Sequence, residues 1–97
     1  MPGYISLMKW TSKGIGEIKA SPERIKQGKA LAEKLGARVV GVWVTMGEYD
    51  MIAVGDFPND QAAATFVLAL AGQGNVTTQT MRALSEDEFA QVVAKLP

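Results

Sequence analysis

The sequence predicts an α+β domain in which a four-stranded antiparallel sheet carries helices on one face. Four short runs rich in β-forming residues alternate with two segments of helical periodicity in the order β-α-β-β-α-β, and a further helical segment follows. The 97 residues are enough for one domain, which we place over residues 1–97, and no repeat or linker divides them. This order of elements is typical of the ferredoxin-like plait.

Turn and capping residues set the bounds of the first elements. Residues 4–10 are the first strand, which ends at the turn residues 11–14, and residues 15–20 favour a single helical turn. Ser21, followed by proline and glutamate, is typical of a helix start, because its hydroxyl accepts hydrogen bonds from free N–H groups. We expect this helix to end at Gly36.

The second half begins with a predicted hairpin. Residues 39–46 and 50–57 are apolar runs that Gly47 and Glu48 join in a turn. A Pro-Asn-Asp segment then caps a second helix over residues 61–71, and residues 76–84 form the fourth strand.

A third helical segment follows from Ser85. The second helix, residues 61–71, has almost no polar side, so we expect both of its faces to be buried. Either the third helix of the same chain or a second copy can cover its outer side. The apolar residues of the third helix form one stripe: Phe89, Val92, Val93 and Leu96.

Composition excludes several kinds of site. The chain has no Cys and no His, so disulfides, thiol nucleophiles, Ser-His-Asp triads and Cys or His metal sites are impossible. We expect no metal and no cofactor. The Gly14-Ile15-Gly16 segment lacks the other residues of a nucleotide fingerprint, and the carboxylates of residues 56, 60 and 86–88 fit no calcium loop.

Charge and hydropathy limit the partners. Ten basic residues balance ten acidic ones, although residues 1–49 hold eight basic and four acidic groups and residues 50–97 hold two and six. This balance argues against nucleic acid, and the uneven distribution is compatible with self-association. The longest apolar stretch, residues 62–71, is far shorter than the ~20 residues that span a bilayer, and no signal peptide is visible. We predict a cytoplasmic protein that binds neither nucleic acid nor membrane.

Alternation along the strands divides the sheet into two faces. One set of side chains is uniformly aliphatic and suits the helix-covered core: Ile5, Leu7, Val40, Val42, Val44, Ile52 and Val54. The other set mixes aromatic, sulfur-containing, small and polar side chains, and we expect it on the uncovered face: Tyr4, Ser6, Met8, Trp10, Val39, Gly41, Trp43, Thr45, Met51, Ala53, Gly55 and Phe57, joined by Thr78, Thr80 and Arg82 of the fourth strand.

The mixed face is too apolar to remain in water, because monomers rarely expose contiguous apolar patches above about a few hundred Å². We expect a second copy to cover it, sheet against sheet, in a dimeric α/β barrel-type homo-oligomer, either a dimer or larger. Apolar walls with a few polar groups are typical of a small-molecule pocket, so this interior is also the predicted ligand site. Its expected ligand contacts are Ser6, Met8, Trp10, Trp43, Thr45, Phe57, Thr80 and Arg82.

The hairpin carries the segment Gly47-Glu48-Tyr49-Asp50, which occurs together with Ser21-Pro22-Glu23-Arg24, Gly74-Asn75-Val76-Thr77-Thr78 and Arg82-Ala83. With these segments the chain, from Tyr4 to about Glu88, resembles the GYD domain family of small bacterial and archaeal proteins. That family is similar in outline to the dimeric α/β barrel group, so the resemblance implies a ferredoxin-like fold and oligomers. It implies no particular reaction, cofactor or catalytic residue.

Tyr49 and Asp50 have two interpretations. In the structural one, Asp50 bonds N–H groups of the turn and the Tyr49 ring lies over the sheet edge with its hydroxyl paired. In the functional one, the two side chains bind a ligand together.

Three functions remain open. The leading hypothesis is a small oligomeric protein that binds a small apolar or aromatic molecule between its sheets. The first alternative is a cofactor-free oxygenase or isomerase. By analogy with related barrels, Arg82 would hold an anionic substrate oxygen and Tyr49 would move a proton. Because the chain has no His, the general base would be Asp50 or another carboxylate. The second alternative is a structural or regulatory module that binds another protein. The sequence does not decide whether the protein is an enzyme.

Overall fold

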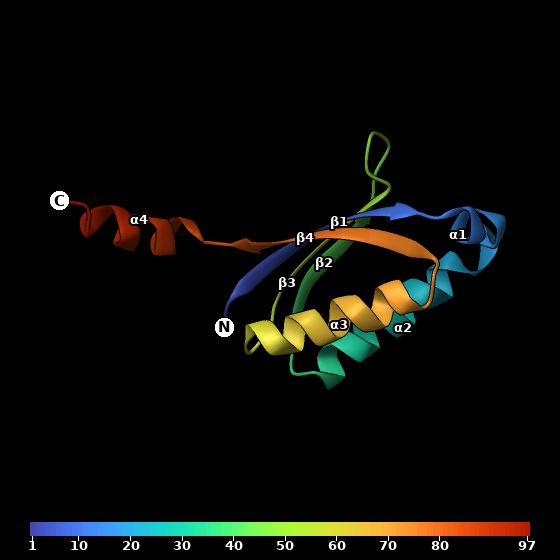
Figure 1. Cartoon of the computed structure of the whole chain (residues 1–97), viewed down its shortest axis with the longest axis horizontal. Helices are drawn as coiled ribbons and strands as arrows, with labels where there is room; N and C mark the ends of the chain where they lie inside the picture. Colours follow the sequence, from blue (N-terminus) through green and yellow to red (C-terminus); the bar gives the residue numbers. More distant parts are fainter.

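The computed structural model describes residues 1–97 and contains the predicted order of strands and helices (Figure 1). The sheet is antiparallel with the strand order β2-β3-β1-β4, so the first and third strands are central. None of the helices has the length and hydropathy needed to span a bilayer. The elements are β1 (Gly3–Trp10), α1 (Ser12–Gly16), the short 3-10 helix η1 (Ile18–Ala20), α2 (Ser21–Lys34), β2 (Arg38–Val44), β3 (Met51–Asp56), α3 (Asp60–Gly72), β4 (Val76–Ala83) and α4 (Glu86–Ala94).

The connection between β1 and α2 is more helical than expected. Thr11 caps α1, because its side-chain oxygen accepts a hydrogen bond from the Gly14 N–H at 3.1 Å. The turn η1 then runs directly into α2, so Ala20 stands at the N-cap and Ser21 is a buried first helical residue. The prediction that Ser21 caps this helix is therefore wrong, because the residues before it are already helical. The predicted helix end is confirmed by Gly36, which adopts φ 89°.

Helices α2 and α3 cover one face of the sheet, and no helix covers the other (Figure 1). α2 packs against β2, and α3 packs against β4. The rings of Tyr4 and Phe57 meet edge to face beneath these helices, with their centroids 5.7 Å apart. A second buried cluster consists of Met8, Met51 and Val76. The core of the domain is therefore one layer between the sheet and two helices.

This core reverses our assignment of the two sheet faces. The side chains of Tyr4, Met8, Met51 and Phe57 were expected on the uncovered face, yet they are buried under the helices. The reason is the size of the helix residues, since small residues on α2 and α3 leave space that only large side chains from the sheet can fill. The small helix residues in this layer are Gly28, Ala32, Ala62 and Ala63.

A β-bulge changes the alternation within β2. Val39 pairs with Gly55, and Gly41 pairs with the adjacent residue of β3, Val54. Between these two pairs β2 therefore has one residue more than β3. Val39 and Trp43, which we placed on the same face, therefore lie on opposite faces. Trp43 is on the uncovered face, as predicted.

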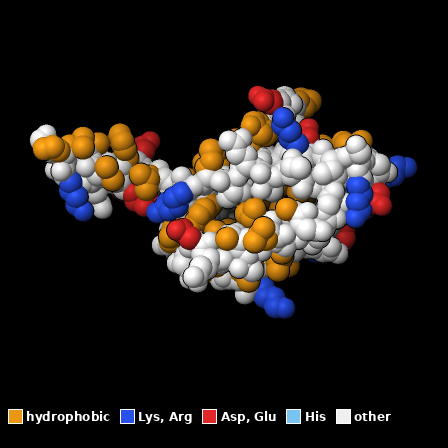
Figure 2. All heavy atoms as spheres, viewed as in Figure 1, with side chains coloured by type: hydrophobic (Ala, Val, Ile, Leu, Met, Phe, Trp, Pro, Cys, Tyr) orange, Lys and Arg blue, Asp and Glu red, His pale blue; other side chains and the backbone are white.

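Helix α4 leaves the end of β4 and extends away from the rest of the molecule (Figure 1). It forms no substantial packing with any other element. The alternative in which the third predicted helix covers α3 within the same chain is thus wrong, because the two-residue link after Ala83 continues in the direction of the strand. Phe89 and Leu96 of the apolar stripe are 60% and 66% exposed. Hydrophobic side chains lie along one side of this helix in Figure 2.

The single chain exposes more surface than its mass requires. Its accessible area is 6505 Å², whereas a folded monomer of this mass exposes about 5,400 Å². Its Cα radius of gyration is 14.7 Å, against about 12.5 Å for a compact domain of this length. The uncovered sheet face and α4 both contribute to this difference.

Candidate functional site

The uncovered face of the sheet, which we call the open face, carries two rows of side chains that cross all four strands. Strand register defines these rows, because cross-strand partners lie on the same face. The first row is Trp43, Ile52, Leu7 and Gln79. The second row is Gly41, Val54, Ile5 and Met81. Six of these eight residues are apolar and larger than glycine, and no other part of the chain is layered over them.

Trp43 is the largest side chain of the open face and is 51% exposed. Its indole lies along β2 above Gly41, where an added Cβ would come within 2.5 Å of the ring. Glycine at this position therefore lets the indole lie flat against its own strand. The flat ring and the aliphatic rows next to it form a continuous apolar surface.

Polar groups border the rows at both ends. At one end Arg38 and Asp56 face each other across β2 and β3 and form an ion pair, with Nη2 and Oδ2 2.7 Å apart. At the other end Tyr49 donates its hydroxyl hydrogen to Oε1 of Gln79 at 2.8 Å, and Nζ of Lys9 lies 5.2 Å from the centroid of the Tyr49 ring. An apolar centre with a polar rim is typical of a protein interface.

Asp50 fixes the base of the hairpin to β1. Its Oδ2 accepts a hydrogen bond from the Trp10 N–H at 2.9 Å, and its own N–H donates to the Met8 carbonyl at 2.9 Å. Thr45 closes the hairpin from the other side, where its hydroxyl donates to the Tyr49 carbonyl at 2.6 Å. The paired Tyr49 hydroxyl agrees with the structural interpretation, whereas Asp50 bonds the N–H of Trp10 in β1 and not the N–H groups of the turn.

The predicted ligand contacts are divided between regions of the molecule. Ser6, Met8, Trp10 and Phe57 line a space between the sheet and the helices. The Thr80 hydroxyl lies on this side too, 2.8 Å from the Ser6 hydroxyl. Trp43 is on the open face, Thr45 is at the base of the hairpin, and Arg82 is exposed near the end of β4. The structure therefore brings together the first five residues and separates the other three from them.

The three candidate catalytic residues do not form one cluster. Tyr49 bonds Gln79 of the open face, whereas Arg82 pairs across the strands with Tyr4, whose side chain points to the covered face. The Arg82 guanidinium instead lies 5.9 Å from the Tyr4 ring centroid and 3.3 Å from a carboxylate oxygen of Glu88. No group of three His, Cys, Asp or Glu side chains is placed to hold a metal ion.

The pKa values of two ionisable groups are shifted, and in both cases the cause is a contact that holds the fold together. The hydrogen bond that Tyr4 donates to Asp60, together with burial, raises the pKa of the Tyr4 hydroxyl. The backbone N–H of Ser85 bonds the carboxylate of Glu88, and this contact, with the nearby Arg82, lowers the pKa of Glu88. The first contact ties β1 to α3, and the second holds the start of α4.

Sequence reasoning missed the space under the helices. The signal that indicates it is the run of small residues on the inner side of α2 and α3, such as Gly28, Ala32 and Ala63. These residues cannot fill a sheet-to-helix layer by themselves. Reading the helices and strands together would therefore have placed the aromatic residues beneath them.

The fold and the open face define a class of protein, namely ferredoxin-like domains with one helix-covered and one bare sheet face. Within this class the chain belongs to the GYD domain family, whose model matches residues 4–93. This family membership confirms the resemblance noted in the sequence.

Known proteins are similar to the chain at two levels. It is 33% identical over 97 residues to the glutamine synthetase and cystathionine beta-lyase binding protein of Thermus thermophilus, with 99% of each chain covered. Its fold is similar to the crystal structure of FFRP-DM1, with a TM-score of 0.64 and 21% identity over 87% of this chain and 100% of that one. A candidate glycine cleavage system transcriptional repressor has a TM-score of 0.56 and 16% identity over 89% of this chain and 47% of that one. The two structural likenesses establish the fold alone.

Proposed function

We propose that this protein is a homo-oligomeric binding protein. A second copy covers the open face, and the assembled particle docks onto another protein. The observation that carries the proposal is the pair of apolar rows crossing a sheet face that no helix covers.

The surplus surface of the single chain supports self-association. The accessible area of 6505 Å² exceeds that of an average monomer of this mass by about 1,100 Å². A stable interface of standard size buries about 800 Å² from each partner. One sheet-to-sheet contact is therefore of the right size to bring the exposed area per chain back to an ordinary value.

Face-to-face packing is the arrangement that the side chains favour. Stacked sheets lie about 10 Å apart, a distance that interdigitating Leu, Ile, Val and Trp side chains fill. A two-fold axis presents the same rows from each copy, so the Trp43 indole of one chain meets the aliphatic rows of the other. Such a dimer is the barrel-type assembly expected from the sequence.

This arrangement changes the role of the sheet-to-sheet interior. Of the three aromatic ligand contacts predicted there, Trp43 alone lies on the open face, since Trp10 and Phe57 lie on the other side. We therefore assign assembly, and not ligand binding, to this interior.

Binding to another protein is supported by the curated relative. That protein is named for binding glutamine synthetase and cystathionine beta-lyase, and it aligns with this chain over 99% of both. In this chain we assign such a partner to α4, which extends away from the sheet and whose apolar stripe is not covered within the chain. An amphipathic helix that places its apolar face in a groove of a partner is a common mode of protein recognition.

The oligomer is tested by size-exclusion chromatography with light scattering. We expect the wild type at least as a dimer at micromolar concentration and Val54→Lys as a monomer, because a lysine in the centre of the second row places a charge in the interface. Leu68→Lys is the matched control, since Leu68 is exposed on α3 and away from the open face. A monomeric wild type would contradict the proposal.

The partner is tested by biolayer interferometry with glutamine synthetase and cystathionine β-lyase of the same organism. We expect at least one enzyme to bind and Phe89→Ser to weaken that binding more than tenfold without changing the oligomer. Gln91→Ser, an exposed substitution on the same helix, is the control. Absence of wild-type binding to both enzymes would remove the assigned partners and leave the oligomer untouched.

A further inference from the structure

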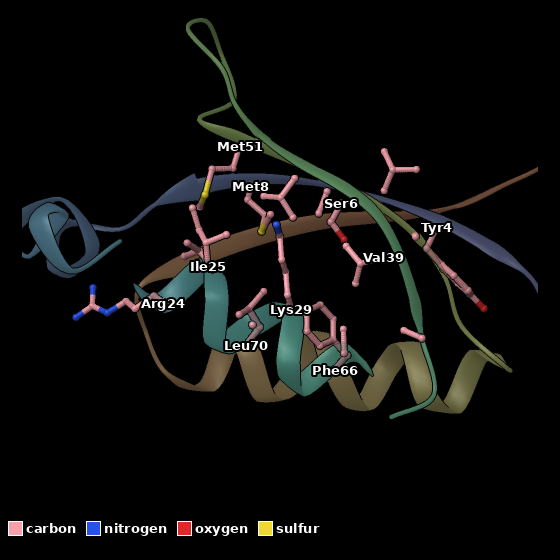
Figure 3. Close-up of a pocket in the computed structure, with 18 of the residues that line it drawn as sticks. Tyr4, Ser6, Met8, Arg24, Ile25, Lys29, Val39, Met51, Phe66 and Leu70 are labelled. Atoms are coloured by element: carbon pink, nitrogen blue, oxygen red, sulfur yellow. The ribbon is translucent and has the colours of Figure 1, made fainter. Parts of the chain in front are cut away.

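A cavity of about 110 Å³ lies on the covered side of the sheet, between the sheet and the helices α2 and α3 (Figure 3). In Figure 2 the surface is hollowed between the strand layer and the helix layer, and hydrophobic side chains lie along this hollow. Met8 and Met51 reach into it from the sheet, and Phe66 and Leu70 reach into it from α3. For comparison, an engineered apolar cavity of about 150 Å³ binds benzene.

Gly28 borders this cavity. It lies inside α2 and lines the cavity, and a Cβ added to it would meet no atom within 4 Å. A glycine within a helix is less stable than alanine by about 0.5–1 kcal/mol. Since no neighbour within the chain requires glycine here, its absent side chain leaves space that is available to a ligand.

The polar groups of the cavity are few. The Ser6 hydroxyl is already paired with Thr80. The side-chain Oδ1 of Asn75, another lining residue, is buried and accepts no hydrogen bond within the chain. A buried acceptor without a partner is unfavourable by about 1–3 kcal/mol. This oxygen has no accessible surface towards the cavity, so the cavity offers a ligand an apolar space with few free polar groups.

The charge of the lining is positive. No Asp or Glu is among the lining residues, which include Arg24 and Lys29. Arg24 is paired with Glu17 and points away from the cavity in Figure 3, whereas Lys29 extends from α2 towards the sheet and belongs to none of the ion pairs of the chain. The Lys29 ammonium group therefore favours an anionic group at this position.

We propose that this cavity binds a small carboxylic acid with an aromatic or branched aliphatic body. The apolar body occupies the space beside Gly28, and the carboxylate pairs with Lys29. The site lies on the opposite side of the sheet from the open face and does not rest on the proposed function.

The test compares two matched probes, 3-phenylpropionate and its neutral amide. Binding is followed by the fluorescence of Trp10, which lines the cavity, in a Trp43→Phe background, and by thermal shift. We expect 3-phenylpropionate to bind and the amide to bind at least tenfold more weakly. No binding of any probe up to millimolar concentration would overturn the proposal.

Two variants locate the site. Gly28→Leu fills the cavity and places a good helix former in α2, so it should fold and lose binding of both probes at least tenfold. Lys29→Met should abolish the preference for the acid over the amide, while Lys26→Met, an exposed residue of α2 that does not line the cavity, should keep it. Unchanged binding in Gly28→Leu, or an unchanged acid preference in Lys29→Met, would overturn the assignment.

Discussion

The two faces of the sheet are both apolar, yet they are built differently. On the covered face two large side chains from the sheet side, Tyr4 and Phe57, pack against alanines of the helices. Tyr4 and Phe57 are only 8% and 7% exposed. On the open face aliphatic residues and a flat indole form an even surface with no layer above it. Large side chains from the sheet that pack against small helix residues form a core within the chain. An even apolar surface instead suits contact with an identical surface.

Mutations distinguish the two faces, and the largest expected loss of stability is on the covered face. Phe57→Ala should reduce the free energy of unfolding by about 3–5 kcal/mol, because it removes a buried ring that contacts both Tyr4 and Phe66. Urea unfolding followed by circular dichroism measures this loss. The loss should be the same at low and high protein concentration.

Val54→Ala is the counterpart on the open face. Its effect should grow with protein concentration, because the lost contacts lie between copies and not within one chain. Equal effects of Val54→Ala at all concentrations would mean that the open face is not an interface.

The order of elements was predictable because its signals are local. The helix end at Gly36 and the caps of α3 and α4 can be identified from neighbouring residues. The assignment of the faces failed because it depends on residues far apart in the sequence. Ile5 and Tyr4 are both apolar, and the small residues of the helices decide which of them is covered.

The candidate site was predictable only in part. Trp43 was placed on the uncovered face although its strand contains a bulge, which alternation alone does not reveal. The paired hydroxyl of Tyr49 was predicted, but the bond of Asp50 to Trp10 was not, because it joins the hairpin to a strand far away in the sequence. The cavity beside Gly28 could not be predicted from strand patterns, because its walls come from both layers.

A smaller loss of stability is expected from overpacking at one end of the covered side, where α1 meets the start of β4. A Cβ on Gly14 would lie 2.1 Å from the Asn75 carbonyl oxygen, which accepts the Thr11 N–H at 3.0 Å. Gly14→Ala should therefore reduce the free energy of unfolding by about 1–3 kcal/mol, in the range of other overpacking substitutions. Thermal unfolding provides the measurement.

Gly16→Ala is the matched control in the same short helix. A Cβ at Gly16 meets nothing within 4 Å, so the substitution should be neutral or slightly stabilising. If both variants lost stability equally, the cause would be the backbone of α1 and not the contact with Asn75.

The smallest effect concerns α4, which belongs to neither face within the chain. Ser85 and Glu88 form a capping box, in which the Ser85 side chain accepts from the Glu88 N–H and the Glu88 carboxylate accepts from the Ser85 N–H. Ser85→Ala should reduce the stability of this helix by about 1 kcal/mol. Since α4 forms no substantial packing with any other element, amide exchange should change mainly in α4.

The same cap gives α4 a pH dependence of known sign. The Ser85 N–H and the Arg82 guanidinium lower the pKa of Glu88, so the ionised carboxylate stabilises α4 above the pKa of an unfolded glutamate, about 4.3. This stabilisation is lost as the pH falls through the lower pKa of the folded state. The protection factors of the α4 amides should therefore fall below about pH 4 in the wild type and in Ser85→Ala, which keeps the backbone donor. Glu88→Gln removes the titrating group and should remove this loss of protection. An unchanged acid response in Glu88→Gln would assign the pH dependence to another carboxylate of α4.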